Sequence, residues 1–408
     1  MGHRRVVVTG LGVVSPIGSG VADYADGLFA GRCGIGPLSL VPTEGLSVRI
    51  AGEVRGFDPA AHFDARRLGL LDRGSQFALV AARQAVEASG LGFASDFGGP
   101  LGLRTATILG TGVGGITTLD EGFHRLYRQG AQRLHPFTIP RLMVSAPTAQ
   151  VSMEFGLTGP AFTASSACAS AAHAIGLAFQ MVRGGLADAA VTGGTEASLT
   201  FGALKGWEAM RIVSPDGCRP FCATRNGMVL GEGAAVLVLE TLDSARGRGA
   251  DILGEIAGFG MSADAKDITA PDAAGAARAM RAALADAGLE PDGVGYVNAH
   301  GTGTTANDAT EARAIHAVFG DHARRLLVSS TKSMVGHALG AAGALEAAAT
   351  LLALRRQVVP PTAGVERPDP ACALDVVPRD ARDAKVEAAL SNSFAFGGLN
   401  AALAFRRV

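Results

Sequence analysis

The chain has 408 residues and a formal net charge of −1 at pH 7, with 48% of its residues hydrophobic and 18% charged. This balance argues against general nucleic-acid binding, and the apolar runs are interrupted well before membrane-spanning length. Five scattered cysteines, an odd number, favour a reducing compartment over a disulfide framework. We therefore expect a cytoplasmic protein that binds neither nucleic acid nor membrane.

The first half is predicted to alternate strands with helices. A compact β-branched run at 5–9 predicts a buried strand that ends in a turn at Gly10 and Gly12. The pattern then predicts helices at 23–30 and 75–89, an irregular stretch over 44–75, strands at 105–109, 189–193 and 234–240, and a cap of bulky residues broken by prolines and glycines over 116–147.

The second half repeats this alternation from residue 252. It predicts a strand leading into a glycine turn over 252–263, helices at 273–287, 308–319 and 338–355, and strands at 295–299, 326–330, 388–390 and 401–406. Strands of small residues lead into helices in both halves, at ASSACASAAHAI and at VSSTKSMVGHALG. We interpret this weak symmetry as a duplicated α/β unit, with one half over 1–251 and the other over 252–408.

The stretch 161–184 places a cysteine at a strand-to-helix junction. Apolar residues after Cys168 recur near helical spacing until Gly184 and Gly185 end the helix. Unpaired N–H groups and the helix dipole at such a position favour a reactive thiolate. An inert buried thiol is the alternative, since free cysteines are commonly buried.

The glycine-rich turn after the strand at 105–109 matches a dinucleotide-binding pattern only in part. Gly110, Gly112 and Gly115 fit GxGxxG, but no acidic residue lies between Glu121 and Glu154 to hold a ribose. Close backbone packing beside a cleft is the better interpretation of these glycines.

Polar residues follow two strands of the second half. His300 lies in NAHGTGT, Lys332 and His337 lie in STKSMVGH, and Gly397 and Gly398 lie in a turn, SFAFGGLN, between the final strands. A lone histidine is more often a satisfied core or cap residue. Two histidines and a lysine at strand ends, the usual place for sites in α/β folds, indicate chemistry together with Cys168.

These stretches, in this order and spacing, resemble the β-ketoacyl-acyl-carrier-protein synthases, the condensing enzymes of the thiolase superfamily. The resemblance covers the whole chain, from VVVTGLGVVSPIG through NGMVLGEGAAVLVLE to SFAFGGLNAALAF. It implies a five-layered αβαβα fold of two similar halves that works as a dimer. The implied reaction is decarboxylative Claisen condensation: an acyl chain on the enzyme is extended by malonyl carried on an acyl carrier protein.

The resemblance also implies residue roles. Cys168 would be the nucleophile, and its N–H with that of Phe396 would form the oxyanion hole. Neutral His300 and His337 would hydrogen-bond the malonyl thioester oxygen, so no catalytic metal is expected. Lys332 would be a support that pairs with acidic residues, here Asp308 and Glu346. Phe396 would be the gate to the acyl pocket.

Further residues are assigned by the same resemblance. The substrate-binding set is Thr302, Thr304, Val113, Thr138, Gly397 and Gly398. A structural monovalent cation would lie near Asn298, Glu346 and Ser391. No cofactor is expected, because phosphopantetheine arrives on the acyl carrier protein. The acidic carrier would dock on Arg66, Arg67, Arg133 and Arg211, although each could equally be an ordinary surface arginine.

Some positions depart from the family pattern. The gate turn reads AFGGLN where GFGGTN is usual, so Ala395 should stiffen it and Leu399 removes a hydroxyl. HGTGT and Asn307 resemble polyketide-type enzymes. Thr138 stands where fatty-acid relatives often have a phenylalanine facing the partner's acyl pocket, and the smaller residue could admit a longer or stiffer chain.

Three alternatives were weighed. A degradative thiolase would have a second cysteine at the gate turn, and a non-catalytic chain-length factor, a scaffold subunit of a ketosynthase heterodimer, would lack Cys168. A Cys–His hydrolase would release its acyl group to water without malonyl. The sequence leaves open the pathway (fatty acid, polyene or aromatic polyketide) and the choice between a homodimer and a heterodimer with a chain-length factor.

Overall fold

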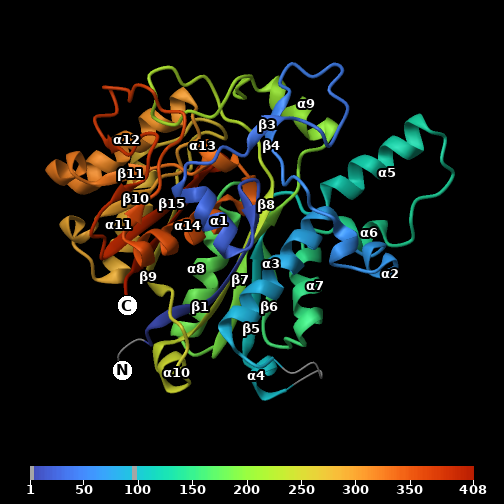
Figure 1. The fold of residues 1–408 in the computed structure, drawn as a ribbon, viewed down its shortest axis with the longest axis horizontal. Helices are drawn as coiled ribbons and strands as arrows, with labels where there is room; N and C mark the ends of the chain where they lie inside the picture. Colours follow the sequence, from blue (N-terminus) through green and yellow to red (C-terminus); the bar gives the residue numbers. More distant parts are fainter. Residues whose placement is uncertain (1–3, 94–98) are drawn as a thin grey trace.

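The computed structural model describes residues 4–93 and 99–408, and its strands fall into two sets of five (Figure 1). The first set is β1 (Val6–Ser15), β5 (Thr105–Gly110), β6 (Ala161–Ala164), β7 (Ala189–Glu196) and β8 (Gly233–Thr241). The second set is β9 (Gly254–Ala263), β10 (Tyr296–Asn298), β11 (Leu327–Ser329), β15 (Ala388–Ala395) and β16 (Leu399–Arg406).

The two sets share one topology. The first has the order β1-β8-β7-β5-β6 and the second β9-β16-β15-β10-β11. In each, the first two pairings are antiparallel and the last two are parallel. A short antiparallel pairing of β1 with β9, over Val6–Val8, joins them. The duplication predicted from the sequence is confirmed in the strand order, while the boundary between residues 251 and 252 stays a prediction.

Six helices complete five layers. Their bounds are α3 (Arg73–Ser89), α7 (Ala146–Phe155), α8 (Ser170–Arg183), α11 (Ala273–Ala287), α12 (Thr305–Phe319) and α14 (Ala342–Arg356). Helix α3 packs outside the first set of strands with α7, and α11 packs outside the second with α12. Between the sets lie α8 and α14, which contact each other and strands of both sets. The predicted αβαβα fold is therefore confirmed.

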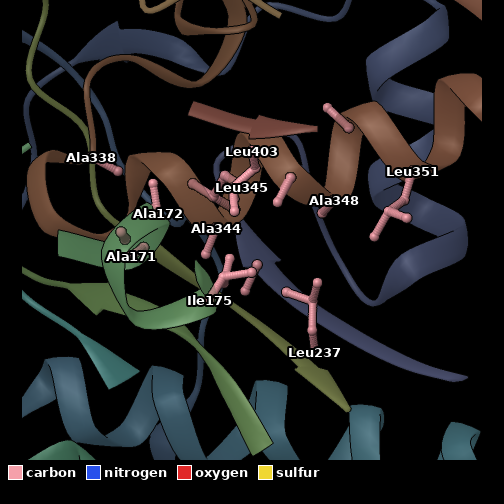
Figure 2. Packing of buried hydrophobic residues seen from close by; sticks show 14 of the residues in the cluster. Ala171, Ala172, Ile175, Leu237, Ala338, Ala344, Leu345, Ala348, Leu351 and Leu403 are labelled. Carbon is pink, nitrogen blue, oxygen red and sulfur yellow. The ribbon is translucent and has the colours of Figure 1, made fainter. Parts of the chain in front are cut away.

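The central layer is built from small side chains. Ala172 and Ile175 of α8 belong to the same buried cluster as Ala344, Leu345 and Ala348 of α14 (Figure 2). Alanine lets two helix backbones approach closely, and the alanine-rich α14 is buried over nearly its whole length. Because both helices begin at the same end of the layer, the residues just before them can share a site.

The glycine turns predicted in the first strand of each half are wrong. Both strands run on through their glycines, because those glycines lie under a covering helix. A Cβ at Gly10 or Gly12 would lie within 2.0 Å of a carbonyl oxygen of α3. A Cβ at Gly258 or Gly260 would lie within 2.4 Å of a carbonyl oxygen of α11. These glycines permit close helix-on-strand contact, which a sequence pattern cannot distinguish from a turn.

Shorter elements connect this frame. They are α1 (Val21–Phe29), α2 (Ala65–Leu68), α4 (Pro100–Leu103), α5 (Ile116–Arg128), α6 (Thr138–Leu142), α9 (Phe201–Ala209), α10 (Leu242–Gly247), α13 (Lys332–Val335), β2 (Gly18–Ser19), β3 (Ile35–Pro37), β4 (Ile50–Gly52), β12 (Val358–Val359), β13 (Asp375–Val376) and β14 (Arg382–Asp383). The predicted cap is α5 to α7, of which α5 extends away from the layers (Figure 1). Among the helices of the described residues, none combines the length and the apolar character needed to cross a membrane.

Candidate active site

Cys168 lies in a tight turn between β6 and α8. Ala167, just before it, has a φ of 50°, a left-handed conformation that is strained for a residue with a side chain. Ser170 fastens the turn, because its hydroxyl donates to Ala167 O at 2.6 Å and accepts from Ser166 N at 2.9 Å. Strain held by local hydrogen bonds is common at functional sites, and here it fixes the position of one sulfur atom.

The thiol of Cys168 is buried, with 7% of the residue exposed. Burial raises the pKa of this thiol to about 12, and the ammonium of Lys332 lowers it only in part. The expectation of a stabilised thiolate is therefore wrong: desolvation outweighs the helix terminus, and the neutral thiol is the resting form.

His300 follows β10 and is held by its backbone. The carboxylate of Glu311, on α12, accepts hydrogen bonds from His300 N at 2.8 Å and from Gly301 N at 2.7 Å. Glu311 is itself buried, and Asn392 donates to it at 3.2 Å. Burial raises the pKa of Glu311 to about 7, and the hydrogen bonds that it accepts oppose that rise.

His337 precedes α14 and is held by the first half of the chain. Its N–H donates to Val229 O at 2.7 Å, and its carbonyl accepts from Gly231 N at 2.9 Å. Its ring lies 5.4 Å from the ring of His300, centroid to centroid, at 83°. Among the described residues, neither ring nitrogen of His337 has a hydrogen-bond partner. Buried unpartnered nitrogens of this kind indicate a binding partner from outside the chain.

Lys332 connects the second half of the site. Its ammonium pairs with the carboxylate of Glu346, donates to His300 O at 2.6 Å, and lies 3.4 Å from Nδ1 of His300. An ammonium can only donate, so Nδ1 accepts and the ring proton of neutral His300 belongs on Nε2. Burial and Lys332 hold the pKa of His300 and His337 well below the usual 6.5, as predicted for neutral imidazoles.

One cavity of about 460 Å³ brings both halves together. Seven of the predicted site residues line it: Cys168, His300, His337, Thr302, Thr304, Phe396 and Gly398. The hydroxyls of Thr302 and Thr304 lie 2.9 Å apart. The opposite wall is apolar and includes Trp207, Met210, Ile212 and Met228. The cavity therefore pairs one thiol and two neutral imidazoles with an apolar wall and a hydroxyl-bearing wall.

Three predicted substrate-binding residues lie elsewhere. Gly397 donates its N–H to Ile268 O at 2.7 Å, behind the lining. Val113 is 42% exposed and does not line the cavity. Thr138 is buried, and its hydroxyl donates to His135 O at 2.7 Å, because α6 begins there and turns the side chain inward. Within this chain, Thr138 is therefore not placed to face a partner.

The supporting acidic residues divide differently from the prediction. Glu346 pairs with Lys332 as expected, but Asp308 does not. Asp308 accepts from Phe221 N at 2.8 Å and Gly303 N at 3.2 Å, and it lies 3.8 Å from the guanidinium of Arg225. Asp308 shapes the loop after His300, because the nearer arginine and backbone donors satisfy it.

The predicted cation-binding residues lie together. Asn298 pairs with Ser391 across β10 and β15, and its Nδ2 donates to Glu346 O at 3.4 Å. Within the described part of the chain, Asn298 Oδ1 and Glu346 Oε2 are buried without a hydrogen-bond partner. Orphaned oxygens of this kind fit a small cation.

The predicted docking arginines lie on the surface. Arg66, Arg133 and Arg211 are exposed, whereas Arg67 pairs with Glu154 at 3.2 Å. No geometry distinguishes a docking role for them from ordinary solvation.

Three residues near the cavity were missed from the sequence. Glu311 anchors His300, and Trp207 lines the cavity. Glu196, buried at the end of β7, accepts from Gly112 N at 2.6 Å and Gly340 N at 3.0 Å, so it ties the glycine-rich turn to the segment after His337. Acidic residues in apolar stretches were the available signal for the two glutamates. The glycines of the GxGxxG pattern serve close packing, as predicted, since a Cβ at Gly110 would lie 2.3 Å from Ala171 N.

Comparison with known proteins agrees over the whole chain. The family model "Beta-ketoacyl synthase, N-terminal domain" matches residues 3–245, and "Beta-ketoacyl synthase, C-terminal domain" matches residues 253–366. Nodulation protein E of Rhizobium sp. (strain N33) is 46% identical over 405 residues, covering 99% of this chain and 100% of that protein. The 3-oxoacyl-[acyl-carrier-protein] synthase 2 of Staphylococcus aureus (strain N315) is 43% identical over 412 residues, 99% of both chains.

A solved structure described as "The ishigamide ketosynthase/chain length factor" superposes on this one with a TM-score of 0.95, at 38% identity and over 100% of both chains. Family match, full-length relatives and fold all agree with the arrangement of Cys168, His300 and His337. The chain belongs to the β-ketoacyl synthase family.

Proposed function

We propose that the chain is a β-ketoacyl-acyl-carrier-protein synthase that joins an enzyme-bound acyl chain to a malonyl unit with loss of carbon dioxide. One observation carries this proposal: Cys168, His300 and His337, drawn from both halves of the chain, line a single cavity. A thiol can carry an acyl group, and two neutral imidazoles can stabilise an enolate.

In the first half-reaction, the sulfur of Cys168 attacks the carbonyl carbon of an acyl thioester. A new carbon–sulfur bond forms to Cys168, and the carrier thiol leaves with the proton that Cys168 gives up. The N–H groups of Cys168 and Phe396 would donate to the oxygen of the tetrahedral intermediate. Because the resting thiol is neutral, the attack depends on proton removal as the carrier thiolate departs.

In the second half-reaction, a malonyl thioester takes the place of the departed carrier. The ring N–H groups of His300 and His337 would donate to its thioester oxygen, so that the enolate formed as carbon dioxide leaves is stabilised. The enolate carbon then attacks the acyl carbonyl, and the sulfur of Cys168 is released and recovers a proton. Neutral rings suit this task, because burial and Lys332 keep both histidines unprotonated.

Other residues would support these steps. Lys332 would keep His300 in the tautomer with its proton on Nε2, and Thr302 and Thr304 would contact the malonyl arm through their hydroxyls. The chain would need no cofactor of its own, because phosphopantetheine is part of the carrier substrate. A monovalent cation held by Asn298, Glu346 and Ser391 would add positive charge behind the site.

The partner would be an acyl carrier protein, bound at an arginine-bearing surface that includes Arg66, Arg133 and Arg211. The named 3-oxoacyl synthase relative supports this partner, and the ketosynthase/chain length factor structure supports a dimer of either kind. We also propose a cytoplasmic location, which agrees with five free cysteines. The pathway served, fatty acid or polyketide, is not part of the proposal.

The test is intact-mass measurement after incubation with decanoyl N-acetylcysteamine thioester. The unchanged protein should gain one decanoyl group, and Cys168→Ala should gain none. Cys33→Ala is the matched control, because Cys33 is exposed and lies outside the cavity, and it should acylate like the unchanged protein. Acylation that persists in Cys168→Ala would contradict the proposal.

A second measurement distinguishes the alternatives. Acylated protein given malonyl N-acetylcysteamine thioester should release carbon dioxide and yield the β-keto thioester. Release of free decanoic acid without malonyl would identify a hydrolase. Absence of acylation in the unchanged protein would support a chain-length-factor scaffold.

A further inference from the structure

Trp207 is the single tryptophan of the chain and has no role in the chemistry described above. It lies on α9 and lines the cavity that contains Cys168. Its indole stacks on the ring of Phe396, with 6.0 Å between ring centroids and 27° between ring planes. Among the described residues, this is the one aromatic pair that includes Phe396.

The turn that carries Phe396 has room to move. Gly397 and Gly398 have φ angles of 81° and 68°, which give this turn a backbone that other residues rarely adopt. A Cβ at Gly397 would meet nothing closer than 3.8 Å, so the space beside the turn is open. Two backbone hydrogen bonds tether it, from Gly397 N to Ile268 O at 2.7 Å and from Asp264 N to Gly398 O at 2.9 Å. They fix the glycines, and the ring of Phe396 is held by its stack.

The cavity is small for the work proposed for it. Its volume of about 460 Å³ lies toward the low end of ligand sites, which span about 300–1,000 Å³. Condensation requires an acyl chain on Cys168 and a malonyl group in the same space. A wall must therefore give way for a long chain, and the wall beside the glycine pair is Phe396.

We propose that Trp207 is a positioning residue for Phe396 and sets the length of acyl chain that Cys168 accepts. The stack holds the phenyl ring at the cavity wall, so a long chain must separate the two rings to enter, whereas an acetyl group need not. This inference rests on the proposed function, since it takes acylation of Cys168 as given. Aromatic pairs are worth enough to change such a rate about two- to tenfold.

The indole itself reports the separation. Because the chain has one tryptophan, its emission spectrum comes from Trp207 alone. Decanoyl N-acetylcysteamine thioester should acylate Cys168 and shift that emission, whereas the acetyl thioester should acylate it without the shift. Intact mass measured on the same samples separates two failures: no acylation overturns the proposed function, and full decanoylation with unchanged emission overturns the role of Trp207.

Substitution tests the selectivity. In Trp207→Leu the ratio of the decanoylation rate to the acetylation rate should rise about two- to tenfold, because the stack no longer holds Phe396. Trp207→Phe, which can still stack, should keep the ratio of the unchanged protein. Phe201→Leu is the matched control: it removes an aromatic ring from the same helix outside the cavity and should leave the ratio unchanged.

The acetylation rate of each variant is the check on folding. A normal acetylation rate in Trp207→Leu together with an unchanged ratio would overturn the inference. A ratio that rises equally in Phe201→Leu would do the same, since it would assign the effect to α9 as a whole.

Discussion

Gly343 of α14 lies directly against Ala172 of α8: a Cβ on Gly343 would lie 2.9 Å from the backbone nitrogen of Ala172. This contact joins the first turns of the two central helices, one from each half of the chain. Cys168 precedes one helix and His337 precedes the other. Close approach at Gly343 is therefore what brings the thiol and an imidazole from distant parts of the sequence to one cavity.

Gly343→Ala should destabilise the protein. The added methyl group would also meet Ser393 Oγ at 3.0 Å, so the helices must separate, at a cost of about 1–3 kcal/mol. Urea unfolding measures the loss. Gly206→Ala on α9 is the control, because a Cβ there meets nothing within 4 Å, and it should be neutral or slightly stabilising. Equal effects at the two sites would refute the packing role.

Lys332→Met should destabilise the protein and stop condensation. It leaves the carboxylate of Glu346 buried without its cation, and breaking a buried pair in this way costs about 3–5 kcal/mol. Lys332→Met with Glu346→Gln should recover much of the stability, because no buried charge is left unpaired, but not the condensation rate. A single variant as stable as the unchanged protein would show that the pair is unimportant.

Alkylation of Cys168 should show no plateau near neutral pH. The pKa of this thiol is raised to about 12, so the thiolate fraction should increase about tenfold per pH unit throughout the accessible range. Iodoacetamide labelling in a Cys33→Ser background, followed by peptide mass mapping, measures the rate from pH 7 upward. A rate that levels off below pH 8 would mean that the site stabilises the thiolate after all.

Malonyl decarboxylation should not lose rate near pH 6.5. The pKa of His300 and His337 lies well below 6.5, so both rings stay neutral until the pH is far lower. Stability follows the same sign: the unfolded chain takes up protons on these histidines as pH falls below 6.5, the folded chain does not, and the free energy of unfolding therefore decreases.

Carbon dioxide release from malonyl N-acetylcysteamine thioester, measured across this range, tests the pH dependence. His300→Gln should lower the rate about 10²- to 10³-fold, as loss of one donor to an enolate-like oxygen does elsewhere. His124→Gln, at an exposed position on α5, is the control and should behave like the unchanged protein. A rate that falls with a midpoint at pH 6.5 would contradict neutral, shielded imidazoles.

The sequence by itself determined the alternation of elements and most of the residues at the cavity. Helical spacing predicted α11 over its whole length, and β-branched or small-residue runs predicted the strands. Motifs at the ends of strands predicted Cys168, His300 and His337, because parallel strands of one sheet end at a common edge. These features are local, so neighbouring residues in the chain carry their signal.

Only the tertiary structure decided what burial and distant contacts do. Gly10 and Gly258 read as turns until a helix covered them, and the helix terminus at Cys168 was outweighed by desolvation. Asp308 found Arg225 instead of Lys332, and Trp207 found Phe396, across separations that no sequence spacing encodes. The free energy of a charge or a stacked ring depends on its surroundings, and those exist only once the two halves have packed together.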